Sequence, residues 1–128
     1  MNSKKKQQFF EHAIQMAKNS TIICSKHACI IVHKNNIIGK GINKYAYSDK
    51  SRLTIHAEAS AIFDALRNGH KKLLSSPYTF MLVVRISFNL TNCICHSHLN
   101  IALKPSKPCC KCAPLICKYK IPTVYYTV

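Results

Sequence analysis

The sequence predicts an α/β domain in which helices cover a mixed β-sheet of about four strands. Segments with apolar residues at helical spacing alternate with short runs rich in β-branched residues. One near-continuous apolar run, residues 78–87, is typical of a strand buried on both faces, as in a parallel sheet. Helices that connect the strands of such a sheet pack on its faces.

The first half of the chain is expected to contain a helix, a hairpin and a second helix. Apolar residues at helical spacing predict an amphipathic helix over residues 3–18. The segment HACIIVHKN predicts a strand, which a turn at residues 34–36 connects to a second strand, IIGKG. Residues 42–54 are polar, and we expect a loop there. A helix follows, with Thr54 as its N-cap and Gly69 at its end.

The second half adds two strands and a short helix. After the apolar run, residues 88–107 predict a long irregular connection. The segment PCCKCAPLICKYK predicts a helix, and IPTVYYTV predicts a closing strand. Residues 1–128 are therefore expected to form a single domain, which is long enough to bury a core.

Composition favours a globular protein in a reducing compartment. Apolar residues make up 48% of the chain, with no run long enough to span a membrane. The N-terminus does not have the pattern of a secretory signal. Eight cysteines in such a chain favour free thiols and metal ligands over disulfides. We therefore expect a cytoplasmic protein.

The net charge of +15 has two interpretations. It suits an anionic partner, such as a nucleic acid, a nucleotide or an acidic membrane surface. It also suits a compositional bias, because sixteen of the nineteen basic residues are lysines. Arginine is the better residue for forked recognition of phosphate. Charge alone therefore does not decide the function.

Two short motifs supply ligands for a zinc ion. Cys109 and Cys112 lie about 60° apart around a helix axis, so both can bind one ion. Cys110 lies roughly 200° from Cys112 by the same geometry, and we do not expect it to be a ligand. His56 is the expected third ligand, which leaves the fourth position of a catalytic zinc for water.

Glu58 is the expected general base beside this zinc. It lies two residues after His56, so it shares the helical turn without sharing the face of the ligand. Alone, a C-x-x-C pair is typical of a structural zinc site or a redox pair, and H-x-E occurs by chance. Together, with Pro108 before the cysteines, they form the H-x-E…P-C-x-x-C signature of zinc deaminases.

A second group of possible metal ligands lies in CICHSH: Cys93, Cys95, His96 and His98. Their spacing matches no common zinc module, and alternate residues of an extended segment point in opposite directions. We interpret the segment as a loop with incidental thiols.

The chain resembles the cytidine and deoxycytidylate deaminase superfamily. The resemblance covers the leading helix, HACIIVHKNNIIGKGIN, IHAEASAI, LVVRI, SKPCCKC and VYYT. It implies a three-layer α/β/α fold, one zinc ion per chain and a proton shuttle at Glu58. It also implies that Asn43 contacts the substrate sugar and that Ala28 and Cys29 lie near the base. The connection from His56 to Cys109 is longer than in many relatives, and no strand is expected after VYYT, where many relatives have a fifth.

The resemblance implies a hydrolase that acts on a cyclic amidine C–N bond, converting a cytosine nucleoside or nucleotide to its uracil form. An alternative is a base deaminase of tRNA or another nucleic acid, for example from adenosine to inosine. A third interpretation is a non-catalytic, zinc-stabilised module that binds nucleic acid, which Glu58 argues against. We favour a small-molecule substrate over nucleic acid, expect no membrane association, and expect a homo-oligomer.

Overall fold

The computed structural model describes residues 3–22, 25–48, 51–90, 99–107 and 112–127. In chain order the elements are α1 (Ser3–Ala17), β1 (Lys26–His33), β2 (Asn36–Ile42), β3 (Lys44–Ser48), β4 (Ser51–Ile55), α2 (Ala57–Arg67), the 3₁₀ helix η1 (Lys71–Ser75), β5 (Thr79–Leu90), β6 (Leu99–Lys104), α3 (Ala113–Lys118) and β7 (Thr123–Tyr126).

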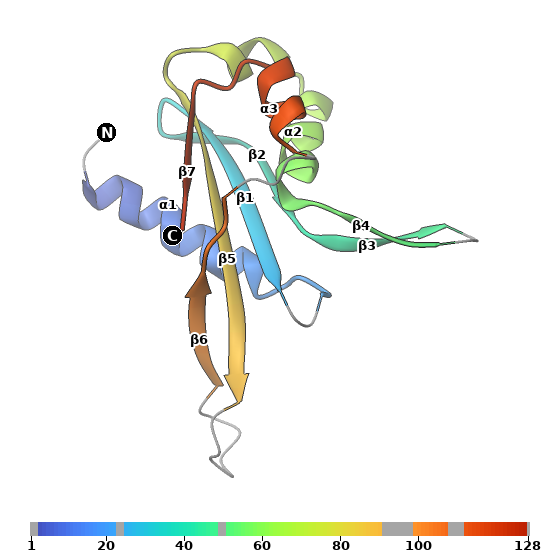
Figure 1. Ribbon diagram of the computed structural model, residues 1–128. Coiled ribbons are helices and arrows are strands. Elements are labelled where there is room, and N and C mark those ends of the chain that lie inside the picture. Colours follow the sequence, from blue (N-terminus) through green and yellow to red (C-terminus); the bar gives the residue numbers. More distant parts are fainter. Residues whose placement is uncertain (1–2, 23–24, 49–50, 91–98, 108–111, 128) are drawn as a thin grey trace.

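The central sheet is mixed, as predicted. Its strand order is β2-β1-β5-β6, and β7 also pairs with β5 (Figure 1). Strand β1 is antiparallel to β2 and β5, and β6 is antiparallel to β5, whereas β7 is parallel to β5. The expected parallel setting of β5 is therefore correct only for its pairing with β7.

Helices cover both faces of this sheet, which confirms the three-layer α/β/α fold. Helix α1 lies across one face, and α2 and α3 lie on the other (Figure 1). Successive residues of β5 alternate between the two layers, because Leu82 and Val84 pack with α1 whereas Met81 and Val83 pack with α2. This double burial explains the continuous apolar run in the sequence.

The turns around the first hairpin and the second helix follow the prediction closely. Lys34 and Asn35 both have positive φ, as a two-residue hairpin turn requires. Gly69, with φ of +79°, follows α2, and its amide donates to the carbonyl of Leu66. The predicted N-cap is wrong: α2 begins after His56, not after Thr54.

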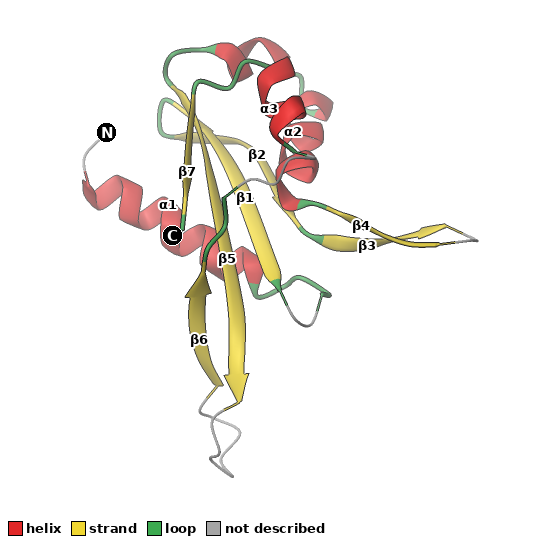
Figure 2. Ribbon diagram, viewed as in Figure 1, coloured by secondary structure: helices red, strands yellow, loops and turns green. Residues whose placement is uncertain are grey.

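Residues 42–54 are not a simple polar loop. Strands β3 and β4 pair as an antiparallel hairpin that extends away from the central sheet (Figure 2). Backbone pairing of this kind does not need an apolar pattern, so the polarity of the segment did not reveal it.

Residues 88–107 also contain regular structure. Strand β5 continues to Leu90, and β6 pairs with it in antiparallel register from Arg85↔Lys104 to Leu90↔Leu99. Within the described residues the central sheet therefore has five strands, one more than the four expected. Turn-forming and polar residues in this segment concealed the second strand.

The last helix is shorter than expected. Helix α3 begins at Ala113, with Cys112 as its N-cap, and ends at Lys118. Pro108 and the residues up to 111 lie outside the described part of the chain. Within the described residues, no helix is long and apolar enough to cross a membrane.

Candidate metal and catalytic centre

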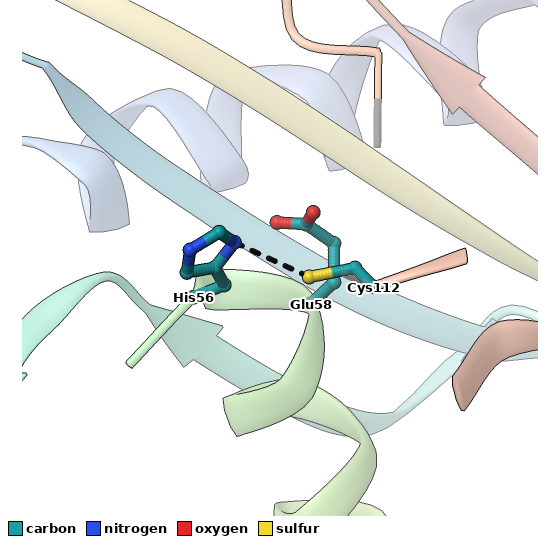
Figure 3. Close-up of side chains that lie close together, drawn as sticks. All are labelled: His56, Glu58 and Cys112. Atoms are coloured by element: carbon teal, nitrogen blue, oxygen red, sulfur yellow. Dashed lines mark hydrogen bonds between the residues drawn. The ribbon is translucent and has the colours of Figure 1, made fainter. Parts of the chain in front are cut away.

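The starts of two helices meet at one point beside the sheet. His56 is the N-cap of α2, and Cys112 is the N-cap of α3. Neither side chain caps its own helix by a hydrogen bond. Instead, the Nδ1 atom of His56 lies 3.3 Å from the Sγ atom of Cys112 (Figure 3). The fold thus brings together two side chains that are 56 residues apart in the sequence.

Glu58 joins them from the first turn of α2. Its side chain is only 5% exposed, because it lies on the face of α2 that packs toward the sheet. One ligand atom each from His56, Glu58 and Cys112 lies within 4.8 Å of the others (Figure 3). The positive end of the α2 dipole favours a carboxylate at this position.

The chemistry of this cluster fits a zinc ion. Imidazole nitrogen and thiolate sulfur are zinc ligands, and Cys112 is buried beside His56, with the Glu58 carboxylate within reach of both. Cys109, the expected second thiolate, lies outside the described residues, as does Cys110.

A cavity of about 300 Å³ opens beside the cluster. This volume is at the lower end of the range for small-molecule sites. Its lining combines polar side chains from strand ends with the first turn of α2: Ile22, Ser25, His27, Asn43, His56, Ala57, Glu58, Ser106 and Lys107. The cluster therefore faces a space that can hold a small ligand.

Asn43 joins the end of β2 to the segment that leads into β1. Its Oδ1 atom accepts hydrogen bonds from the His27 amide at 2.8 Å and from the Ser20 hydroxyl at 2.6 Å. Its Nδ2 atom donates to the Ser25 carbonyl at 2.7 Å. These bonds hold Ser25 and His27 in the wall of the cavity.

The surroundings of His27 disfavour its charged form. Burial lowers the pKa of its imidazole, and the nearby Arg85 and His56 lower it further, whereas Glu58 opposes the shift. Its Nδ1 atom lies 3.3 Å from the Nδ2 atom of Asn43.

Comparison with known families identifies the fold's relatives. The family described as "Cytidine and deoxycytidylate deaminase zinc-binding region" matches residues 3–128. The chain belongs to this family. The resemblance seen in the sequence is thereby confirmed, and the cavity with its His56, Glu58 and Cys112 cluster belongs to a deaminase-family fold.

Solved structures of similar fold include a dCMP deaminase from the cyanophage S-TIM5 in complex with dCMP and dUMP. It is 17% identical, with a TM-score of 0.60 over 98% of this chain and 82% of that one. Its apo form is also 17% identical, with a TM-score of 0.62 over 98% and 84% of the two chains. RibD of Acinetobacter baumannii is 20% identical, with a TM-score of 0.55 over 97% of this chain and 28% of that one. Comparison with curated proteins gave no match.

Ala28 and Cys29 are not among the residues that line the cavity. Both are fully buried; Ala28 packs on the α1 side of β1 and Cys29 on the α2 side. Burial raises the pKa of the Cys29 thiol well above its usual range, and Glu58 and Cys112 add to the rise. In the segment around them, Ser25 and His27 line the cavity instead.

Sequence reasoning missed several residues of the cavity wall: Ile22, Ser25, His27, Ala57, Ser106 and Lys107. Most are polar or charged residues next to a predicted strand or to the cysteine motif. That position was a usable signal, because ligand-binding residues gather where elements end. The other group of potential ligands, Cys93, Cys95, His96 and His98, lies outside the described residues.

Proposed function

We propose that this protein is a zinc-dependent hydrolytic deaminase that converts a cytosine nucleoside or nucleotide to its uracil form and releases ammonia. The observation that carries the proposal is the meeting of His56, Glu58 and Cys112 at the wall of a cavity, in a chain of the deaminase family. The similar dCMP deaminase, which is complexed with dCMP and dUMP, supports a pyrimidine nucleotide.

His56, Cys112 and Cys109 would hold one zinc ion per chain, which when bound supplies Lewis acidity and lowers the pKa of water. Glu58 would act as the general base and acid of the reaction. It would take one proton from the attacking water and deliver it to the ring nitrogen. It would then take the remaining proton from the hydroxyl that has added to the ring carbon and pass it to the departing amine, which leaves as ammonia. Burial of Glu58 keeps its carboxylate away from bulk water, so it exchanges protons with the substrate.

The cavity wall would orient the substrate. Asn43 is the proposed contact of the sugar, and it also holds Ser25 and His27 in place. Ala28 and Cys29 would back the base pocket from within the sheet rather than touch the ligand through their side chains. Lys107 brings a cationic side chain to the cavity lining, which favours a substrate that carries a phosphate.

A substrate panel tests the proposal. Purified protein is incubated with cytidine, deoxycytidine, their monophosphates and tRNA, and ammonia release and base conversion are measured. We expect conversion of at least one of the four cytosine compounds. Conversion of tRNA alone would favour the alternative of a nucleic-acid base deaminase, and no conversion of any compound would contradict the deaminase proposal.

The zinc ligands are tested by metal analysis. Cys109→Ser should abolish zinc binding, whereas Cys110→Ser should leave the zinc content unchanged, because only the first of these thiolates is expected to reach the ion. The zinc content of the purified variants shows which of the two cysteines is a ligand. Loss of zinc from Cys110→Ser alone would show that the ligand set is wrong.

Self-association and a cytoplasmic location stay predictions from the sequence.

A further inference from the structure

One edge of β5 is shared by two different strands. Strand β1 occupies the opposite edge over Thr79–Ile86. Along the shared edge, β7 pairs in parallel over Phe80–Val83, and β6 pairs in antiparallel register from Arg85 onward (Figure 1). The partner of β5 therefore changes between Val83 and Arg85, where neither ladder continues.

The side chains of Ser106 and Thr127 close this junction. The Ser106 hydroxyl donates to the carbonyl of Val83 at 2.8 Å and accepts from the Thr127 amide at 2.7 Å. The Ser106 amide donates to the Thr127 carbonyl at 2.8 Å. The Thr127 hydroxyl lies 2.5 Å from the Lys104 carbonyl and 2.7 Å from the Ser106 hydroxyl. These groups tie β5, β6 and the end of β7 together at one buried point.

The junction lies at the wall of the cavity. Ser106 is only 3% exposed, yet it lines the cavity together with Lys107. Six residues after Ser106, the chain reaches Cys112 beside His56. A chain of that length spans at most about 20 Å. The point at which the chain leaves the sheet therefore restricts where Cys112 and Lys107 can lie.

We propose that the junction of Ser106 and Thr127 is a positioning device for the metal and substrate site, an inference that rests on the function proposed above. Its two residues act through Cys112 and Lys107 and are positioning residues, not catalytic ones. Removal of the Ser106 hydroxyl leaves the buried Val83 carbonyl without its hydrogen bond, and removal of the Thr127 hydroxyl does the same to the partly buried Lys104 carbonyl. Either loss favours displacement of Ser106 and of Lys107 beside it.

A role in general stability alone makes a different prediction, and Thr79 offers a matched control. Its side chain is 2% exposed, and its hydroxyl donates to the Leu73 carbonyl at 2.6 Å and lies 3.0 Å from Nδ1 of His33. It stands on the same strand as Val83 but does not line the cavity. Thr79→Val therefore removes a comparable buried hydrogen bond without touching the junction.

The test measures how well Cys112 is protected from alkylation in the full-length protein with a zinc chelator present. Cys112 and Cys117 fall on one tryptic peptide, CAPLICK, and Cys117 is exposed. Alkylation of Cys117 is thus an internal reference that does not depend on metal or on activity. We compare wild type with Ser106→Ala, Thr127→Val, Thr127→Ser and Thr79→Val, and measure the rate of zinc loss to the chelator in parallel.

We expect Ser106→Ala and Thr127→Val to alkylate Cys112 about five- to tenfold faster than wild type, the population change that follows from the loss of one buried hydrogen bond. Zinc loss should accelerate similarly, and Thr127→Ser, which keeps the hydroxyl, should behave as wild type. Unchanged protection of Cys112 in the two junction variants would overturn the inference. An equal effect of Thr79→Val would overturn it too. A wild type that deaminates nothing would contradict the proposed function, whereas the alkylation rates would still decide this inference.

Discussion

Glu58 is the residue on which the proposed chemistry depends. It lies two positions after His56, in the first turn of α2. Its carboxylate points into the same buried space as the Cys112 sulfur (Figure 3). A chain with only four acidic residues keeps one of them there, where a proton acceptor is useful and solvation is poor.

Replacement of Glu58 by glutamine should abolish most of the activity and leave the structure intact. The amide has a similar shape but cannot accept a proton, so deamination should fall by at least about 10²–10⁴-fold. Zinc content and melting temperature should stay near those of wild type. Asp64→Asn on the same helix is the control, because Asp64 binds Arg67 and the Lys40 amide on the outer side. Wild-type turnover by Glu58→Gln would exclude the proposed mechanism.

His27 should make the folded protein sensitive to acid. Because burial lowers its pKa, the unfolded chain binds more protons than the folded one between the folded pKa and the ordinary value of about 6.5. The free energy of unfolding should therefore fall as the pH drops below that ordinary value. Urea unfolding of wild type and His27→Gln at pH 7.5 and 5.5 measures this, and the variant should lose less stability on acidification. Equal losses in both proteins would contradict the assignment.

At the scale of the elements, the site depends on where α2 lies. Helix α2 packs directly on β2, and a Cβ atom added at Gly41 would lie 2.5 Å from the Ala61 amide nitrogen and 2.8 Å from the Ala57 carbonyl oxygen. Because Gly41 has no side chain, α2 can lie close to the sheet. This position of α2 places His56 and Glu58 at the cavity.

Gly41→Ala should therefore displace α2 and damage the site. Overpacking of this kind costs about 1–3 kcal/mol of unfolding free energy, and zinc binding should weaken as well. Gly69→Ala is the control: nothing lies near its added Cβ, and the cost is only the left-handed backbone, roughly 1–2 kcal/mol. Urea unfolding measures the stability of both variants, and zinc content should be lowered only in Gly41→Ala. Normal zinc binding in Gly41→Ala would show that α2 does not set the site.

At the scale of the whole molecule, the high positive charge gathers in part at a surface hollow of about 350 Å³. Four lysines line it together with Ser75 and Tyr119: Lys71, Lys72, Lys118 and Lys120. All four lysines are exposed, and the hollow is formed by η1 and the end of α3, away from the cavity of the cluster. Such a surface attracts phosphate without reading a sequence.

If the substrate is a mononucleotide, this charge should give only weak binding of nucleic acid. Binding of tRNA at low salt should weaken steeply as salt rises, by a logarithmic slope of about 0.7–0.9 per phosphate contact. Replacement of the four lysines by glutamine should reduce that slope by up to about 3.6. Replacement of Lys4, Lys34, Lys40 and Lys44 removes the same charge elsewhere and is the control. A submicromolar, specific tRNA complex at physiological salt would favour the nucleic-acid alternative.

The apolar patterns of the sequence predicted most of the fold correctly. Helix α1, the first hairpin, α2 and the buried run of β5 follow from spacing, β-branching and turn residues, all of which are local. The β3–β4 hairpin was missed because its pairing joins largely polar segments. Strand β6 was missed although Leu99, Ile101 and Leu103 alternate in it, because the polar and turn-forming residues around it favoured a loop. Prediction of His56, Glu58 and Cys112 rested on side-chain chemistry, and the fold brings all three together.

The sequence alone determined the types of donor and acceptor that this protein can offer to a metal ion or a proton, because chemistry belongs to the side chain. Only the tertiary structure decided which residues surround these groups and how deeply the groups are buried. The contact of Asn43 with His27 and the junction of Ser106 with Thr127 both join segments that are far apart along the chain. Burial and hydrogen-bond partners arise when such segments meet, so no local pattern in the sequence could specify them.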